Sequence, residues 1–356
     1  MSGQAVRALP IRVMTSALVF AVLSGCPDLE LPPLGPGSSL CSPGIRAGFF
    51  ESTPGAERHD LWLAFVDVGH GDATWVRTPG VIGVDAGEIL IDAGDDGWPV
   101  APHVPDGGRA VLDLMQRAGM APGVGLDALV ITHPDKDHYG GASAVLSRHP
   151  ARLVLHGGQP PDTPTWSRLR RRAREIGAVW RTAPDARTGP RPLELGSPFP
   201  VRLLFADPHA VDDNDASLVL ELTFAGRRIV LMGDAGIAVE RRLLDRLEPV
   251  ALLRTGHHGG TGTSGQPLLS AAVTPQTHAV VSAGRRSGLP AVDVLARLTD
   301  HLDDRVWRTD RGDTPLTRRA AAGDDHIVAR IAADTGRLEI CFLDPDPLAV
   351  EGAADL

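Results

Sequence analysis

One short segment, 133–138, holds two histidines and two aspartates within six positions. Imidazole and carboxylate groups are ligands for zinc, manganese and iron, and side chains on one short loop can converge on neighbouring ions. The segment follows an apolar run at 126–132, which predicts a buried strand. A loop that leaves the end of such a strand is a common place for a functional site. The sequence therefore predicts a metal-binding loop with His133, Asp135, Asp137 and His138 as ligands.

The rest of the chain alternates predicted strands and helices in two rounds. Apolar periodicity predicts strands at 61–68, 73–77, 88–91, 126–132, 152–155, 201–205, 217–224, 228–232, 250–254, 278–282, 305–308, 326–332 and 337–343. It predicts helices at 108–118, 141–147, 166–176, 237–247 and 290–302. Hairpin turns such as Ala225-Gly226 join some of the strands. This mixture favours two sheets covered by helices, a four-layer α/β sandwich.

The loop at 133–138 resembles the His-x-His-x-Asp-His motif of metallo-β-lactamase-fold hydrolases, with Asp135 where the second histidine usually stands. This variant is similar to the soluble hydrolase domain of ComEC-type competence proteins. Other segments that match in the same order are 65–73, where glutamine is commoner than His70, and 90–94, 214–220, 231–235, 256–260 and 307–311. The resemblance covers roughly 61–343 and implies the αββα metallo-β-lactamase sandwich.

The resemblance also implies a centre of two divalent ions, zinc or manganese. The implied ligands are His133 and Asp135 for one ion, Asp137, His138 and a late histidine for the other, and Asp234 as a bridge. The late histidine is His257 or His258, and the other one would contact the substrate. Two such ions lower the pKa of a shared water and supply hydroxide for attack on phosphorus or a carbonyl carbon. Asp137 and His258 are the residues expected to take part in catalysis.

Six further polar residues are expected to support the ligands or to serve as additional ones: Asp67, Asp72, Asp92, Asn214, Asp215 and Ser217. The three aspartates at strand ends (67, 72 and 92) would orient ligand histidines through the free ring nitrogen; the alternative is that each caps a turn. One histidine of the family's first metal site is missing, and Asn214 or Asp215 stands near that position. Four other histidines are expected to be surface or packing residues: His70, His103, His156 and His209.

The first 25 residues have the pattern of an export signal. Arg7 and Arg12 precede an apolar stretch at 13–23 that is too short to cross a membrane as a helix. Leu-Ser-Gly-Cys at 23–26 is similar to a bacterial lipobox, so we expect Cys26 to carry a lipid; an ordinary secretory signal is the alternative. The expected product is an extracytoplasmic, membrane-anchored lipoprotein without a transmembrane domain. It would have a linker at 26–58, a hydrolase domain at 59–345 and a tail at 346–356.

The chain has three cysteines. If Cys26 carries a lipid, Cys41 and Cys341 remain. An even number of remaining cysteines in an oxidising compartment favours a disulfide between them, and two free thiols are the alternative.

The charge balance limits the partners. The formal net charge is −9, and it becomes −11 without residues 1–25, because Arg7 and Arg12 are the only charged residues there. An acidic protein disfavours sequence-independent binding to DNA or to anionic membranes. A phosphate substrate remains compatible, because bound metal ions would supply local positive charge. Five arginines on the predicted helix at 166–176 form either a solvated face or a contact for phosphates.

These patterns together predict a metal-dependent hydrolase with phosphodiesterase or nuclease-like activity. Its substrate would be a small molecule or a phosphodiester, with DNA as one candidate. An esterase or lactonase on the same fold is the alternative enzyme, and a non-catalytic binding lipoprotein is the alternative of another class.

Overall fold

The computed structural model describes residues 40–51, 59–80, 86–96, 107–196, 199–284, 288–310 and 325–343. All of them belong to one compact unit of the chain, Leu34–Leu356. The expected export signal, Cys26, His103 and the tail at 346–356 lie outside the described residues. Within the described residues, no helix is both long and apolar enough to span a membrane.

Two sheets form the centre of the fold. The first contains β15 (Leu338–Phe342), β14 (Ile327–Ile331), β1 (Leu61–Phe65), β2 (Thr74–Arg77), β3 (Glu88–Ile91), β4 (Leu126–Ile131), β5 (Ala151–His156) and β6 (Val179–Thr182), in that order. The second contains β13 (Val306–Arg308), β12 (His278–Val281), β11 (Leu252–Arg254), β10 (Arg227–Leu231), β9 (Val219–Phe224), β8 (Val201–Phe205) and β7 (Arg191–Leu193).

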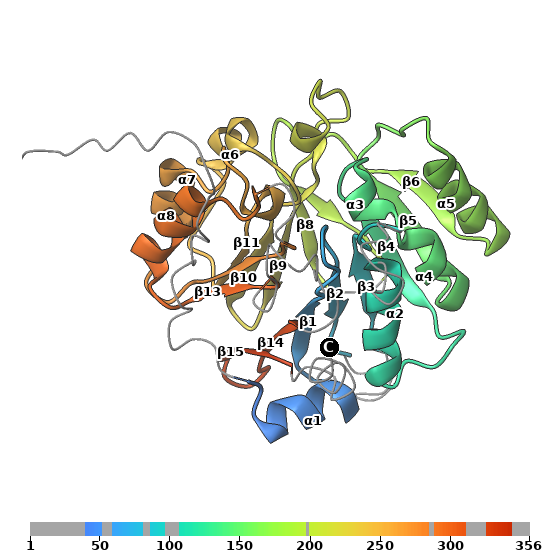
Figure 1. The fold of residues 1–356 in the computed structure, drawn as a ribbon, viewed down its shortest axis with the longest axis horizontal. Helices are drawn as coiled ribbons and strands as arrows, with labels where there is room; N and C mark the ends of the chain where they lie inside the picture. The colour runs from blue at the N-terminus through green and yellow to red at the C-terminus, as the bar shows by residue number, and fades with distance from the viewer. Residues whose placement is uncertain are drawn as a thin grey trace, which may run out of the picture. The chain divides into compact units, whose positions relative to one another are not determined.

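Helices cover the outer faces of both sheets (Figure 1). Those on the first sheet are α1 (Pro43–Glu51), α2 (Gly107–Arg117), α4 (Ala142–Arg148) and α5 (Pro164–Glu175). Those on the second are α6 (Ile237–Leu243), α7 (Gln266–Ala272) and α8 (Val292–Leu302). The short α3 (Lys136–Tyr139) and the 3₁₀ turns η1 (Asn214–Ala216) and η2 (His257–Gly259) lie in connecting loops. The four layers are the α/β sandwich that the sequence predicts.

The two sheets share an apolar core, and side-chain alternation along the strands explains it. In β1, Leu61, Leu63 and Phe65 join the cluster that also contains residues of the second sheet. Trp62 and Ala64 point to the other face, into the cluster with α2, α4 and α5. Successive side chains of a strand face opposite sides, so a strand buried on both faces reads as one apolar run.

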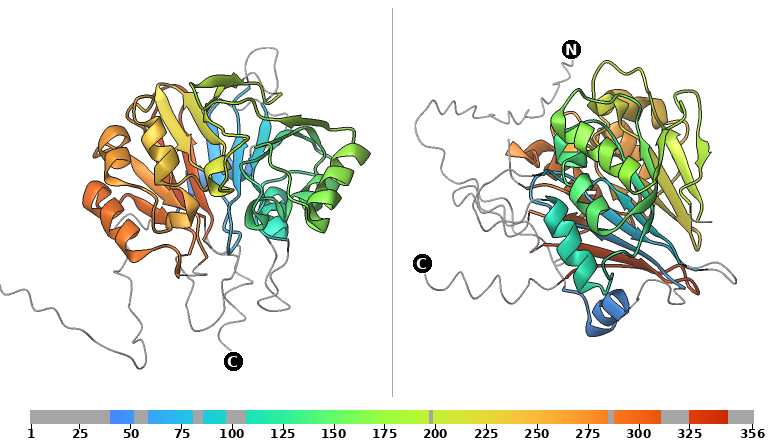
Figure 2. Two further views of the ribbon diagram at one scale, coloured as in Figure 1. Left: turned by 90° about the horizontal axis from the view of Figure 1, so that it is seen from above. Right: turned by 90° about the vertical axis from the view of Figure 1, so that its right-hand side faces the viewer.

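Strand direction brings the functional loops to one edge. Strands β3, β4 and β5 are parallel, and so are β10, β11 and β12. Strand β1 runs in the same direction as β3, because both are antiparallel to β2. The views in Figure 2 show both sheets edge-on with their helices outside. The loops that carry the predicted ligands follow the carboxyl ends of these strands, where α/β proteins commonly bind ligands.

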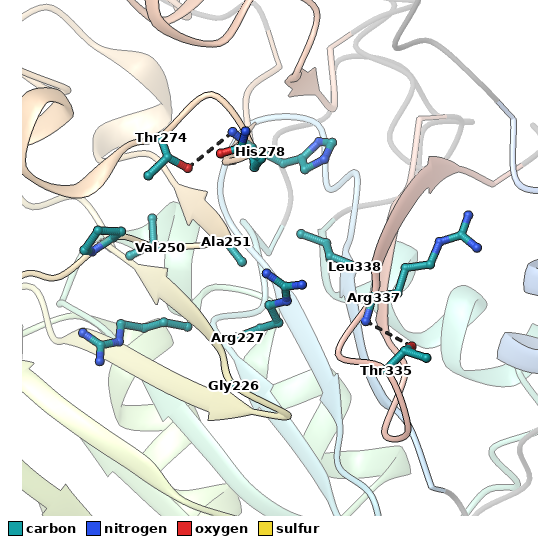
Figure 3. Close-up of a pocket in the computed structure, with 12 residues that line it drawn as sticks. Gly226, Arg227, Val250, Ala251, Thr274, His278, Thr335, Arg337 and Leu338 are labelled. Carbon is teal, nitrogen blue, oxygen red and sulfur yellow. Dashed lines mark hydrogen bonds between the residues drawn. The ribbon is translucent and has the colours of Figure 1, made fainter.

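A cavity of about 470 Å³ lies at the opposite ends of the same strands. It is lined by the starts of β10 and β12, residues 249–251 and the β14–β15 turn, and Figure 3 shows these segments around Arg227. None of the candidate metal ligands lines it. This cavity is therefore separate from the predicted site.

The expected linker at 26–58 is wrong for its last part. Residues 43–51 form α1, and Phe49 is fully buried against Trp62 and Trp75. The Cys41 amide donates to the Phe342 carbonyl, and the structure joins Cys41 to Cys341 by a disulfide. The domain therefore includes residues from position 40 onward. The short strands β6 and β7 are also absent from the sequence-based assignment, because exposed polar residues interrupt their apolar pattern.

We expect the Cys41–Cys341 disulfide to stabilise the fold substantially. It joins residues separated by 300 positions, so it restricts a very long loop of the unfolded chain. The chain-entropy model gives about 5–6 kcal/mol for such a link, as an upper value. Thermal unfolding of the oxidised protein, with and without reductant, measures this. The Cys41→Ser/Cys341→Ser variant should match the reduced protein, and an unchanged melting temperature on reduction would contradict the prediction.

Candidate metal centre

Five loops bring histidine and aspartate side chains together at the edge described above. Residues 133–138 follow β4 and continue into α3, and Asp234 follows β10. The turn η2 follows β11, and its His257 and His258 both have left-handed backbone angles, with φ of 42° and 52°. Non-glycine residues adopt this conformation at a cost, which is typical of functional sites. Here it directs both rings toward the Asp234 carboxylate.

Asp234 is the centre of the cluster. Its carboxylate lies 3.2 Å from His138 Nε2, 3.3 Å from His258 Nε2 and 3.8 Å from His133 Nε2. Asp137 Oδ2 lies 3.4 Å from His258 Nε2, and the Nε2 atoms of His138 and His258 are 3.4 Å apart. These side chains form two overlapping groups of ligand atoms, His133–His138–Asp234 and Asp137–His138–His258. His138 belongs to both groups and to a third, Asp72–Asp92–His138, whereas the sequence-based assignment gives it to one ion only.

Two of the predicted ligands lie at the exposed side of the cluster. Asp135 is 43% exposed, with Oδ2 3.5 Å from His133 Nε2, and His257 is 40% exposed, with Nε2 4.0 Å from Asp234 Oδ2. His258 is 1% exposed and touches both Asp137 and Asp234. Of the two neighbouring histidines, His258 is therefore the inner one. The sequence leaves open which of the two is the ligand, and this geometry places His258 next to the other ligand groups.

Hydrogen bonds on the far side of two rings direct Nε2 into the cluster. His138 Nδ1 lies 2.8 Å from Asp92 Oδ2, and Asp92 also accepts from the backbone and hydroxyl of Thr132. His258 Nδ1 donates to the Ser282 carbonyl at 2.9 Å. With the proton held on Nδ1, Nε2 carries the lone pair that a metal ion needs. Asp92 thus makes the contact that its predicted orienting role requires.

The other two strand-end aspartates make different contacts. Asp72 Oδ2 lies 2.8 Å from Nη2 of the fully buried Arg254, so it pairs with a guanidinium instead of an imidazole. Asp67 Oδ1 accepts from the backbone amide of Gly69 and thus shapes the loop after β1. Arg254 also donates to the Gly233 carbonyl and lies 3.7 Å from Asp234 Oδ1. These contacts differ from the hydrogen bonds to ligand histidines that are expected for Asp67 and Asp72.

In the segment around η1, one residue, Ser217, contacts the backbone of the metal centre. Ser217 Oγ accepts the Asp234 amide at 2.9 Å and so fixes the backbone that carries the central carboxylate. Asp215 instead lines a cavity of about 400 Å³ with Asp207 and Arg242. Asn214 has a buried Oδ1 without a hydrogen-bond partner among the described residues.

The donor set fits divalent metal ions. His133 Nε2 is buried and has no hydrogen-bond partner among the described residues, although it faces two carboxylates. An unpaired buried polar atom is costly, and a metal ion would satisfy it. Ligand atoms bound at about 2.0–2.1 Å in tetrahedral geometry lie roughly 3.3–3.4 Å apart. The separations of 3.2–3.4 Å among His138, His258, Asp137 and Asp234 agree with this spacing.

The carboxylates and imidazoles of the cluster strongly shift one another's pKa values. Burial by itself would raise the pKa values of Asp137 and Asp234, but the neighbouring histidines outweigh it and lower both. Burial by itself would lower the pKa of His258, but Asp234 and Asp137 raise it to about 9. The pKa of His138 is raised by Asp234 and Asp92 against the same effect of burial. Without metal, the cluster therefore holds protonated imidazoles between ionised carboxylates.

We expect metal binding and metal-free stability to depend on pH in opposite directions. A histidine must be neutral to bind an ion, so metal affinity should rise as the pH approaches the His258 pKa of about 9. The ion pairs of protonated His258 stabilise the metal-free fold fully below the unfolded-state pKa of about 6.5. That stability is lost as the pH rises through about 9.

Thermal unfolding of the metal-free protein between pH 6.5 and 9.5 tests the second part. The melting temperature of the wild type should fall over this range more steeply than that of His258→Asn. Parallel curves for the two proteins would contradict the assignment of protonated His258 to this cluster.

Comparison with known proteins agrees with the fold and the site. The model of the metallo-β-lactamase superfamily matches residues 74–277, which is more than half of the chain and includes the loop at 133–138, Asp234 and His258. The chain belongs to the metallo-β-lactamase superfamily. Among solved structures, the match to the metallo-β-lactamase fold protein YhfI from Bacillus subtilis covers 69% of this chain and 96% of that chain, at 13% identity with a TM-score of 0.40.

Three curated relatives of this superfamily member are competence or recombination proteins. It is 30% identical to ComE operon protein 3 of Bacillus subtilis (strain 168), over 70% of this chain and 32% of that protein. It is 26% identical to competence protein ComA of Neisseria gonorrhoeae, over 86% of this chain and 38% of that protein. Recombination protein 2 of Haemophilus influenzae matches at 27% identity over 65% of this chain and 26% of that protein. The chain thus spans about a third of the length of these relatives.

Proposed function

We propose that this protein is a metal-dependent hydrolase that cleaves phosphodiesters. The observation that carries the proposal is the buried ligand set around Asp234, with the Nε2 atoms of three imidazoles facing one carboxylate. The unpaired His133 Nε2 and the strained backbone of η2 support a site built to hold metal ions. The names of the competence and recombination relatives favour a nucleic-acid phosphodiester over a β-lactam as the substrate.

The buried residues of the centre would bind the metal ions. His133, His138, His258, Asp137 and Asp234 would hold two divalent ions, zinc or manganese, with Asp234 between them. When bound, such ions supply a Lewis acid and a source of hydroxide near neutral pH. Asp92 and the Ser282 carbonyl keep two of the rings in the required tautomer and orientation.

The exposed side of the cluster would receive the substrate. Asp135 and His257 lie there, and Asp137 is 20% exposed. Burial lowers the pKa of His257, so its ring is largely neutral at pH 7 and can hydrogen-bond a substrate oxygen or exchange a proton with it. Asp135 is free to act as an additional oxygen ligand from the same side.

We further propose that the protein works outside the cytoplasm, attached to a membrane by a lipid on Cys26. The disulfide between Cys41 and Cys341 supports an oxidising compartment. Loss of membrane association in Cys26→Ala would support the anchor, and unchanged association would contradict it.

We expect hydrolysis of phosphodiesters before that of any other class. The assay compares a bis-aryl phosphodiester, DNA, an aryl ester, a lactone and a chromogenic β-lactam, each with metal-free protein and with added Mn²⁺ or Zn²⁺. Because Asp135 adds a hard oxygen ligand where an imidazole is usual, activity with Mn²⁺ should equal or exceed activity with Zn²⁺. Turnover of the ester or lactone alone would replace the phosphodiesterase proposal with the esterase alternative.

A further inference from the structure

His70 lies in a loop whose backbone leaves it little freedom. It stands between Gly69 and Gly71, which have φ of 72° and 125°, a region that favours glycine. A Cβ at Gly71 would overlap the Asp137 carbonyl oxygen, and a Cβ at Gly284 would overlap the backbone of Gly69. The loop is thus pressed between the start of α3 on one side and the segment after β12 on the other. The position of the His70 ring follows from these close backbone contacts.

The ring reaches the metal centre from this fixed position. Its Nε2 lies 3.0 Å from Asp137 Oδ2, the same oxygen that faces His258 Nε2. The centroids of the His70 and His258 rings are 5.3 Å apart. An ionised carboxylate can only accept a hydrogen bond. His70 Nε2 therefore carries the hydrogen and donates a hydrogen bond to Asp137.

The second ring nitrogen of His70, Nδ1, is in a different environment. His70 Nδ1 is buried without a hydrogen-bond partner among the described residues. With the proton on Nε2, an unpaired lone pair remains buried at Nδ1, which destabilises the fold. An apolar side chain would avoid that cost, so the bond to Asp137 is the feature of His70 that offsets it.

We propose that His70 is a positioning residue for Asp137, holding its carboxylate toward His138 and His258 so that the three side chains bind one ion. The proposal rests on the metal centre of the proposed function, but it concerns a residue outside the ligand set. Partners that hydrogen-bond a ligating carboxylate affect metal affinity by about 10–100-fold when they are removed. Glutamine at position 70 could donate an amide hydrogen to the same oxygen, whereas alanine could not.

Titration of the metal-free protein with Zn²⁺, followed by calorimetry, tests this directly. His70→Ala should bind one of the ions about 10–100-fold more weakly than the wild type. His70→Gln should stay within about threefold, because its amide replaces the donor. His301→Ala is the matched control, since His301 also has a single side-chain partner, Gln266, and lies on α8. The visible spectrum of the Co²⁺-loaded proteins reports the coordination of the ion and should change in His70→Ala only.

The outcomes separate this inference from the proposed function. Wild-type protein that binds no Zn²⁺ would overturn both. Tight binding by the wild type and equal binding by His70→Ala would overturn the role of His70 and leave the metal centre intact. An equal loss in His70→Ala and His70→Gln, with melting temperatures like that of the wild type, would make His70 a direct ligand and overturn the positioning role.

Discussion

Replacing Asp234 with alanine is expected to abolish metal-dependent hydrolysis, with a loss of more than about 100-fold. Among the described residues, its carboxylate is the one group that faces His133, His138 and His258 together. Without it, two neighbouring divalent ions would repel each other with no anion between them, and the three imidazoles would lose their common partner. Activity of the reconstituted variant, with the metal content measured on the same sample, checks this result.

Asp135→His is the matched comparison for Asp234→Ala. Asp135 lies at the exposed side of the cluster, and histidine there restores the usual residue of the family motif. This variant should remain folded and active and should shift the metal preference from Mn²⁺ toward Zn²⁺. Activity in Asp234→Ala that equals activity in Asp135→His would contradict the central position of Asp234.

Arg254→Met should cause the largest loss of stability among single substitutions near the centre. Arg254 is fully buried, and its guanidinium joins Asp72 from the first sheet to Gly233 and Asp234 from the second. Removing one partner of a buried ion pair typically costs about 3–5 kcal/mol, because the other charge stays buried and unpaired. Chemical denaturation of the metal-free proteins measures the free energy of unfolding.

A second substitution distinguishes the ion pair from loss of packing. In Arg254→Met/Asp72→Asn the unpaired carboxylate is gone, so the double variant should be more stable than Arg254→Met alone. Arg109→Met is a surface control, because its side chain is 70% exposed and its partner is Asp113, and it should cost about 1 kcal/mol or less. A double variant less stable than the single one would show that Arg254 acts through packing.

The ligand loop stands out in the sequence because its chemistry is concentrated in one segment. His133, Asp137 and His138 lie within six consecutive positions, and a buried strand precedes them, so local geometry alone brings them together. The fold is predictable for a similar reason. Strands buried on both faces appear as short apolar runs, and they recur between amphipathic helices.

The residues that the sequence misses depend on contacts between distant loops. Arg254 ends an apolar run and looks like a charge at a strand exit, yet it lies between the two sheets, opposite Asp72. His70 is a single histidine between glycines, and no pattern indicates that its loop presses on Asp137. The choice between His257 and His258 depends on left-handed backbone angles at both positions, which residue type does not reveal.

Titration of the metal-free wild type with Mn²⁺ and Zn²⁺ tests the central claim most directly. The account predicts that the chain binds two ions, and that loading restores phosphodiester hydrolysis which the metal-free protein lacks. Asp234→Ala, titrated in parallel, should lose this binding. A folded wild-type protein that binds neither ion at micromolar concentration would contradict the account and favour a non-catalytic binding lipoprotein.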